Sequence, residues 1–238
     1  MSYQRLKNEL NLKYPAFGIS RIKFYDVTTD KKYPCVYKLF DSVLEKGTLY
    51  LTAQNLACKG AATGCGFHDG IPDIPGGFGH FISHGRGEGF PAGECIKCSP
   101  ELAEKMLLAQ PQNVMGDCNA IKLEVFEENT KPELITFLVT PDQLSGLLHL
   151  FYYRRQSYDN VIVPVSSGCA QLFRLPFGEL AKEDPKAVIG NIDFFSRPHL
   201  DEALLAFTVS FSDFKQMCHD VPESCLYSPA WCGVKKRL

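Results

Sequence analysis

A glycine-rich stretch in the first half of the chain limits the fold more than any other feature. Eleven of the 19 glycines lie between Gly60 and Gly93, together with three prolines. Glycine loses more backbone entropy on ordering than other residues do, so a long regular helix or strand is costly here. We therefore predict a long loop at about residues 60–98, and loops of this length in compact domains are often functional.

Regular helices and strands are predicted on both sides of this loop. Ser99-Pro100 and Thr140-Pro141 are typical first residues of helices, because Ser and Thr cap the free backbone amides and Pro fits the first turn. Hydrophobic spacing predicts helices at residues 3–12, 35–46, 100–107, 141–151, 166–173 and 213–219. It predicts strands at residues 21–24, 48–52, 120–126, 134–139, 161–165 and 204–209. Interleaved strands and helices indicate one α+β domain, residues 1–238, with a mixed sheet and packed helices.

Composition narrows the class of protein and its compartment. The chain has 238 residues and a net charge of −2, and its basic residues are scattered, so we expect no nucleic-acid partner. No apolar stretch is long enough for a membrane span, and the N-terminus lacks a signal peptide pattern, so we expect no membrane partner and a cytoplasmic location. The cytoplasm keeps thiols reduced, so the ten cysteines favour metal binding or thiol chemistry over disulfides.

Two cysteines, Cys58 and Cys65, lie among the first glycines of the predicted loop. Glycine lets backbone amides approach a cluster's sulfur atoms and donate hydrogen bonds that tune its reduction potential. The pair is therefore a candidate for two ligands of a metal cluster. Two unrelated loop thiols would give the same pattern.

Cys95 and Cys98 form a Cys-x-x-Cys motif directly before the helix that starts at Ser99-Pro100. The helix N-terminus and a lysine between the two cysteines favour a thiolate, so the pair is a candidate redox dithiol. With His80 and His84 upstream, the same cysteines could instead complete a tetrahedral zinc site. The alternative is a pair of loop histidines that serve no metal.

Cys169 follows a predicted strand and enters a predicted helix. A helix N-terminus favours a thiolate, which suits a nucleophile or a cluster ligand. The alternative is a small buried core cysteine.

Cys218, Cys225 and Cys232 recur every seven residues in the C-terminal segment at about 211–238, which we read as a cysteine-containing tail. Pro222 and Pro229 interrupt any single helix there, so we treat that spacing as coincidence.

Several short motifs occur in a recognisable order along the chain. They are Cys35-Val36-Tyr37-Lys38-Leu39, Leu49-Tyr50-Leu51-Thr52, Leu56-Ala57-Cys58-Lys59-Gly60, Ser99-Pro100-Glu101-Leu102-Ala103, Thr140-Pro141-Asp142-Gln143-Leu144, Ser167-Gly168-Cys169 and Asp201-Glu202-Ala203-Leu204-Leu205-Ala206-Phe207. Their order resembles an uncharacterised prokaryotic family, domain of unknown function 169, over roughly Tyr3 to Val209.

The resemblance implies an α+β intracellular domain and no established activity. It draws attention to Cys35, Cys58 and Cys169 as positions that match cysteines of the family. The chain departs from the family pattern at Lys59, where the family often has proline. Cys65 and the Cys95–Cys98 pair also look like additions.

Our leading hypothesis is an iron–sulfur cluster held by Cys35, Cys58 and Cys169, with Cys65 as the fourth ligand. Its role would be electron transfer or redox sensing, with a redox partner protein or a small molecule beside it. Zinc is the alternative metal. Cysteines from separated segments can meet in one cluster site.

Two hypotheses of other classes stay open. In the first, the protein is a small-molecule-binding module without metal, whose glycine-rich loop grips an anionic metabolite. In the second, it is a thiol oxidoreductase that uses Cys95 and Cys98. The oligomeric state does not follow from the sequence.

Overall fold

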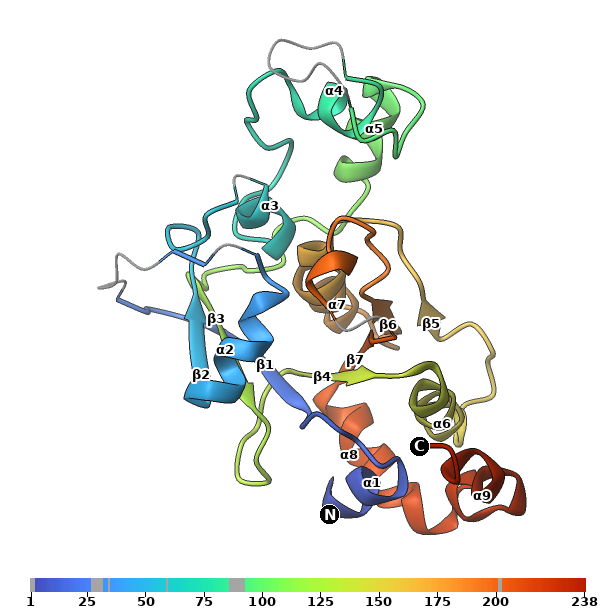
Figure 1. Cartoon of the computed structure of the whole chain (residues 1–238). Coiled ribbons are helices and arrows are strands. Elements are labelled where there is room, and N and C mark those ends of the chain that lie inside the picture. The colour runs from blue at the N-terminus through green and yellow to red at the C-terminus, as the bar shows by residue number, and fades with distance from the viewer. Residues whose placement is uncertain (1–2, 27–31, 34, 59, 86–92, 201–202) are drawn as a thin grey trace.

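A mixed β-sheet forms the centre of the computed structural model, which describes residues 3–26, 32–33, 35–58, 60–85, 93–200 and 203–238 (Figure 1). In this described part the strands lie in the order β2-β3-β1-β4-β7-β6-β5. Their bounds are β1 Phe17–Ile22, β2 Thr48–Leu51, β3 Ala120–Val125, β4 Leu134–Val139, β5 Val161–Ile162, β6 Ala187–Gly190 and β7 Leu205–Ser210. Neighbouring strands are antiparallel except β5 and β6, which run parallel. The predicted α+β class and mixed sheet are confirmed.

Helices cover both faces of the sheet, because its central strands are apolar on both sides. In β4, Leu134 and Leu138 face one hydrophobic cluster, and Ile135, Phe137 and Val139 face the other. The first face carries α2 (Lys38–Lys46), α7 (Leu175–Leu180) and the π-helical turn η1 (Ala170–Arg174). The second carries α1 (Tyr3–Glu9), α6 (Pro141–Tyr152), α8 (Phe211–Asp220) and α9 (Pro229–Lys235). Figure 1 shows the second group together on one side of the sheet.

The predicted helix starts are confirmed where a side chain at the start of the helix caps its backbone amides. Ser99 accepts a hydrogen bond from the Leu102 amide at the start of α5 (Pro100–Leu108). Thr140 and Gln143 form a complete capping box at the start of α6.

The short strand β5 ends before Pro164 and lies at the edge of the sheet, where a proline removes no ladder hydrogen bond.

Two short helices interrupt the glycine-rich loop that was predicted at about residues 60–98. They are α3 (Ala61–Cys65) and α4 (Phe78–Ile82). The glycines lie at helix ends and close contacts: Gly66 ends α3 with a φ of 95°. A Cβ on Gly79 would lie 2.8 Å from the Pro100 carbonyl oxygen, so glycine lets α4 pack against α5. Part of the predicted loop, residues 86–92, lies outside the described residues.

The first predicted strand was displaced. It was expected at residues 21–24 with Phe24 facing the core, but β1 ends at Ile22 and Phe24 is 90% exposed in a left-handed conformation. The observed strand begins earlier, at Phe17, and includes Gly18. A Cβ on Gly18 would lie 3.1 Å from Pro132, so the missing side chain suits this close approach. Strand β6 (Ala187–Gly190) was not predicted at all.

The C-terminal segment 211–238 is helical and packs against the second face of the sheet. After α8 come two 3-10 turns, η3 (Val221–Glu223) and η4 (Cys225–Tyr227), and then α9. Phe214 and Trp231 are buried in the second hydrophobic cluster. The three cysteines spaced by seven residues therefore lie on three separate helices, as the two prolines predicted.

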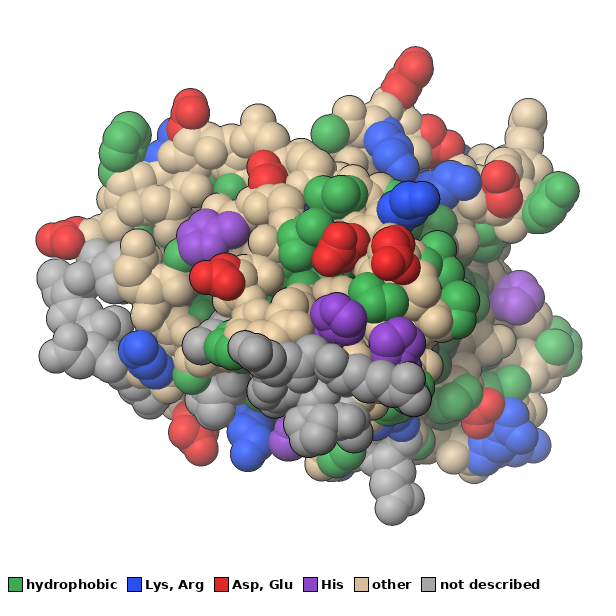
Figure 2. All heavy atoms as spheres, turned by 90° about the horizontal axis from the view of Figure 1, so that it is seen from above, with side chains coloured by type: hydrophobic (Ala, Val, Ile, Leu, Met, Phe, Trp, Pro, Cys, Tyr) green, Lys and Arg blue, Asp and Glu red, His purple; other side chains and the backbone are tan. Residues whose placement is uncertain are grey.

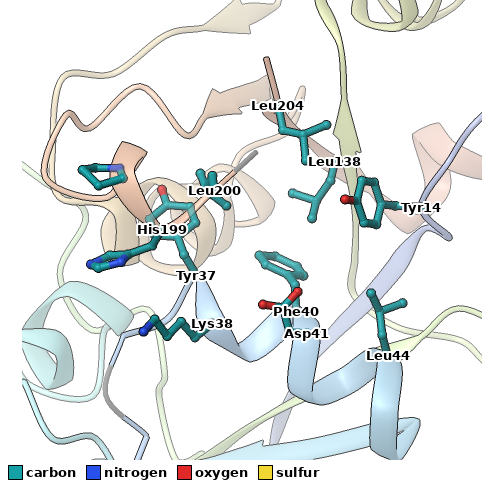
Figure 3. Close-up of a pocket in the computed structure, with 11 residues that line it drawn as sticks. Tyr14, Tyr37, Lys38, Phe40, Asp41, Leu44, Leu138, His199, Leu200 and Leu204 are labelled. Atoms are coloured by element: carbon teal, nitrogen blue, oxygen red, sulfur yellow. The ribbon is translucent and has the colours of Figure 1, made fainter. Parts of the chain in front are cut away.

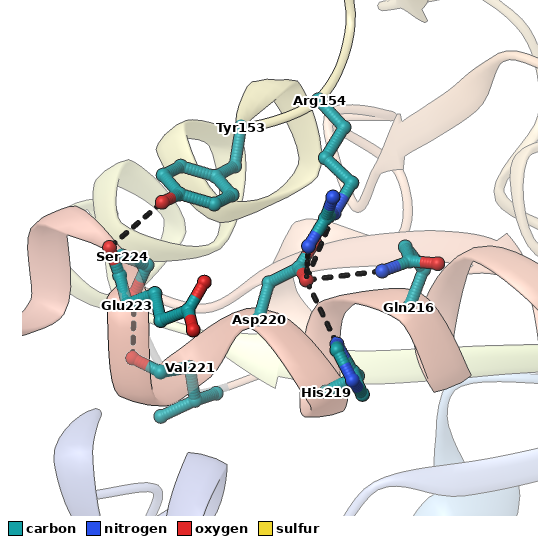
Figure 4. Close-up of polar contacts among 8 residues, drawn as sticks. All are labelled: Tyr153, Arg154, Gln216, His219, Asp220, Val221, Glu223 and Ser224. Carbon is teal, nitrogen blue, oxygen red and sulfur yellow. Dashed lines mark hydrogen bonds and ion pairs between the residues drawn. The ribbon is translucent and has the colours of Figure 1, made fainter.

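A buried carboxylate, Asp220, joins the ends of α6 and α8 (Figure 4). Arg154 Nε and Nη2 donate to it at 2.8–2.9 Å, and Gln216 Nε2 donates at 3.0 Å. Tyr153 next along the chain donates its hydroxyl to the Glu223 carbonyl at 2.8 Å. The Arg154 guanidinium lowers the pKa of Asp220 against the opposing effect of burial. The network ties the C-terminal helices to α6.

We predict that Asp220→Asn lowers the melting temperature at pH 7 by about 3–8 °C, because the amide cannot carry the charge that Arg154 pairs with. The pKa of Asp220 is lowered in the folded state, so its stabilising contribution is complete above its unfolded pKa and is lost as the pH falls through the lower folded value. The difference between wild type and variant should therefore shrink below about pH 4. Thermal unfolding from pH 2 to pH 7 measures it.

Asp142→Asn is the matched control, because its ion pair with Arg237 is largely exposed. Exposed pairs contribute little to stability. A melting temperature for Asp220→Asn equal to that of Asp142→Asn at neutral pH would contradict the role of the network.

Candidate thiol site

Four cysteines from separate segments lie near one another on the first face of the sheet. Cys65 ends α3, and Cys169 lies directly before η1. Nearby Cys65 and burial raise the pKa of Cys169 well above its usual range. Burial raises the pKa of Cys35, and nearby Cys169 and Cys58 raise it further. The four predicted ligand positions therefore interact electrostatically.

The environment of Cys169 does not favour a thiolate. The helix start at this position was expected to lower its pKa, but the effects of Cys65, burial and the nearby Asp193 carboxylate outweigh the backbone contribution. The Cys169 thiol is therefore harder to ionise than an ordinary cysteine. The prediction of a thiolate created by the helix N-terminus was wrong.

Two glycines allow this close packing. A Cβ on Gly64 would lie 2.8 Å from the Cβ of Cys169, closer than real side chains approach. A Cβ on Gly168 would overlap the Tyr37 ring and the Ser196 hydroxyl. The missing side chain of Gly64 therefore lets α3 approach the start of η1, and that of Gly168 lets the same segment approach Tyr37.

A fully buried arginine, Arg174, ties α3 to η1. Its side chain is 0% exposed, and it donates to the carbonyls of Thr63 (Nε, 2.8 Å), Pro111 (Nη1, 2.8 Å) and His68 (Nη2). Asp69 lies 3.3 Å from Nη1 and supplies a carboxylate. Arg174 thus holds the chain on both sides of Cys65 against the helix that Cys169 begins. η1 is π-helical, a rare geometry that often occurs at functional sites.

Tyr37 and Asp193 line the same region. Asp193 Oδ2 accepts hydrogen bonds from the Gly168 amide at 2.9 Å and the Ser196 hydroxyl at 2.7 Å. The Tyr37 hydroxyl is buried beside Cys169 and Asp193, and burial raises its pKa beyond its usual range. The Ser196 hydroxyl lies near it and lowers its pKa slightly, but no described residue makes a hydrogen bond of good geometry with the Tyr37 hydroxyl. A buried unpaired hydroxyl costs about 1–3 kcal/mol, so it suits a polar group bound at the thiols.

Metal-ligand geometry is not pre-formed in the described part of the chain. No group of three or more His, Cys, Asp and Glu side chains there has the arrangement that holds a metal ion. The four thiols would need to move towards a common centre to bind one. All ten cysteines are free thiols.

The other predicted motifs lie near α4 and α5, which project from the sheet in Figure 1. Cys95 and Cys98 are exposed, and Cys95 has a left-handed φ of 51°. His80 and His84 have ring centroids 6.1 Å apart, and Nδ1 of each lies 3.1 Å from the Gly85 carbonyl oxygen. The redox-pair and zinc hypotheses for these residues stay predictions.

Figure 2, which looks down on the molecule from above, shows acidic and basic side chains interspersed on this face.

Sequence reasoning missed three residues of the thiol site. Tyr37 and Asp193 gave no signal of their own, because their roles depend on contacts between distant segments. Arg174 did give a signal: it is a single charged residue in the apolar run Ala170-Gln171-Leu172-Phe173-Arg174-Leu175. A charged residue inside a buried helix is rarely present without partners.

Comparison with known proteins identifies one family. The model of DUF169, described as "Uncharacterised ArCR, COG2043", matches residues 5–220. No curated protein and no solved structure matches the chain. None of the described helices has the length and apolar character needed to cross a membrane.

We predict that Arg174→Met lowers the free energy of unfolding by about 3–5 kcal/mol, because three buried carbonyls lose their donor. Urea unfolding measures the change. Arg237→Met is the control, because Arg237 forms an exposed ion pair and should change stability by less than about 0.5 kcal/mol. Equal stability of the two variants would contradict the anchoring role of Arg174.

We also predict that Gly64→Ala destabilises the protein by about 1–3 kcal/mol, because its methyl group overlaps Cys169. Gly60→Ala is matched to it: the glycine lies in the same segment with a negative φ, and its Cβ would meet nothing within 4 Å. That control should be neutral or slightly stabilising. Unfolding midpoints in urea decide between the two, and equal effects would refute the close packing of α3 on η1.

Proposed function

Because the chain belongs to the uncharacterised DUF169 family, we propose a function from its own thiol geometry: an iron–sulfur protein for electron transfer or redox sensing. The proposed ligands are Cys35, Cys58, Cys65 and Cys169. One observation carries the proposal. Cys65 raises the pKa of Cys169, and Cys169 and Cys58 raise the pKa of Cys35, although the four cysteines come from separate segments.

The electrostatics of the thiols support a cationic centre. Buried thiols with raised pKa values gain most from a nearby positive charge, because a metal ion replaces the protons and pairs with the thiolates. Metal binding would therefore release protons. It would also draw the sulfur atoms together, since no ligand set has metal spacing in the metal-free arrangement of the described residues.

The unpaired Tyr37 hydroxyl supports the same proposal. Hydrogen bonds to cluster sulfur atoms tune the reduction potential, and Tyr37 has a buried donor beside Cys169 with no partner of good geometry among the described residues. Cys58 is exposed, so it offers the route by which a redox partner protein or small molecule could approach the centre. The ten free cysteines support a reducing compartment, and we propose the cytoplasm.

Anaerobic purification tests the proposal. We expect a brown protein with about two or four iron atoms per chain and matching sulfide. Cys169→Ser should lower the iron content about tenfold or more, because it removes a central ligand. Cys232→Ser is the control, because Cys232 is exposed on α9 on the opposite face of the sheet.

A colourless protein that stays free of iron after anaerobic reconstitution would refute the cluster. Zinc found instead of iron and sulfide would support the alternative metal, and its loss in Cys95→Ser would assign it to the Cys-x-x-Cys motif. Unchanged iron in Cys169→Ser would exclude the proposed ligand set.

The nearness of Cys65 to Cys169 favours a second candidate, a metal-free dithiol couple. In it, the two thiols would form one disulfide and pass two electrons and two protons to a disulfide of a partner. Mass spectrometry of metal-free, oxidised protein tests this candidate by showing whether a Cys65–Cys169 cross-link forms. The oxidoreductase hypothesis for Cys95 and Cys98 predicts the cross-link at those residues instead.

A further inference from the structure

A second site opens on the other side of Tyr37. A cavity of about 380 Å³ lies between α2, the end of β4 and the chain around His199 and Leu204 (Figure 3). Pockets for small molecules have volumes of about 300–1,000 Å³. The cavity is therefore large enough for a metabolite of modest size.

The first turns of α2 give the cavity an ordered series of chemical groups. Lys38, Asp41 and Leu44 all line it, and each follows the last by three residues, so they share one face of the helix. The series is a positive charge, a negative charge and an apolar side chain, separated by about 4.5 Å along the helix axis at each step.

The side chains that other elements contribute to the cavity lie in the same order, with the basic one near Lys38 and apolar ones near Leu44. Figure 3 shows His199 on the same side of the cavity as Lys38, with Asp41 in the middle and Tyr14, Leu138 and Leu44 on the opposite side. Phe40, Leu200 and Leu204 add to the apolar lining. One end of the cavity can thus hold an anion, and the other can hold a hydrocarbon group.

The charged side chains of the cavity have no partners within the described protein. Lys38 and Asp41 are neighbours on one helix face, yet no ion pair or side-chain hydrogen bond joins them to each other or to another described residue. The His199 ring likewise makes no such contact within that part of the chain. All three side chains are exposed, and no other described residue engages their polar atoms.

We propose that this cavity binds a free α-amino acid with an apolar side chain, such as leucine or phenylalanine. Lys38 and His199 receive the carboxylate, and Asp41 receives the ammonium group. The side chain lies against Phe40, Leu44 and Leu138. A simple carboxylic acid would make no contact with Asp41, and a simple amine would make none with Lys38. The site does not depend on the proposed metal centre.

Calorimetric titration of the reduced 238-residue chain tests the proposal with defined probes. L-Leucine or L-phenylalanine should bind with a Kd between about 1 μM and 1 mM. 4-Methylpentanoate lacks the ammonium group and 3-methylbutylamine lacks the carboxylate, so each should bind about tenfold or more weakly. Glycine lacks the apolar side chain and should bind more weakly as well.

Substitutions on α2 test which charged side chain binds which charged group of the amino acid. Asp41→Asn should weaken leucine binding about tenfold and leave the weak binding of 4-methylpentanoate unchanged. Lys38→Met should weaken both. Glu45→Gln is the matched control, because Glu45 is exposed on the same helix and does not line the cavity.

Two results would overturn the proposal. The first is no binding of either amino acid up to millimolar concentration. The second is leucine binding that Asp41→Asn weakens no more than Glu45→Gln does. Iron content is measured on the same samples, so failure of this proposal is distinguishable from failure of the iron–sulfur proposal.

Discussion

The buried guanidinium of Arg174 is the interaction on which the thiol site depends. Removing an arginine from water is costly, and the cost is offset here because three backbone carbonyls and Asp69 surround the group. Those carbonyls belong to α3, to the turn after it and to the segment before β3. Cys65 and Cys169 therefore meet because one charge must be satisfied by groups from several segments. The contact between the thiols is a consequence of that anchoring.

The helix α2 connects the thiol site with the cavity. Successive residues of a helix point about 100° apart, so Tyr37 at its start faces Cys169 and Gly168 while Lys38 and Asp41 face the cavity. Tyr37 lines both sites. A ligand in the cavity would contact one side of the residue whose hydroxyl lies among the thiols. The fold thus provides a direct physical connection between a small-molecule site and a thiol centre.

Local sequence signals predicted the fold well. They could not predict contacts between segments that are distant in the chain. The starts of α5 and α6 followed from Ser99-Pro100 and Thr140-Pro141, because capping involves only neighbours in the chain. Helices α3 and α4 were missed, because each is short and depends on packing against η1 or α5 at Gly64 or Gly79. The four cysteines were grouped on the order of family motifs and on glycine chemistry. No local pattern could show that Arg174 reaches Thr63, His68 and Pro111.

The protonation of the thiols decides what chemistry the site can perform. Cys169 and Cys35 are partly buried beside other thiols and near Asp193, and each of these effects makes a thiolate more costly. A lone nucleophilic thiolate is therefore disfavoured at neutral pH. A cation reverses the balance, because it stabilises several thiolates at once and relieves their mutual repulsion. Oxidation to a disulfide also avoids the cost of forming thiolates, because the sulfur atoms of a disulfide are uncharged. The arrangement thus favours metal binding or disulfide formation over nucleophilic catalysis, and the two are distinguished because only disulfide formation removes two electrons from the thiols.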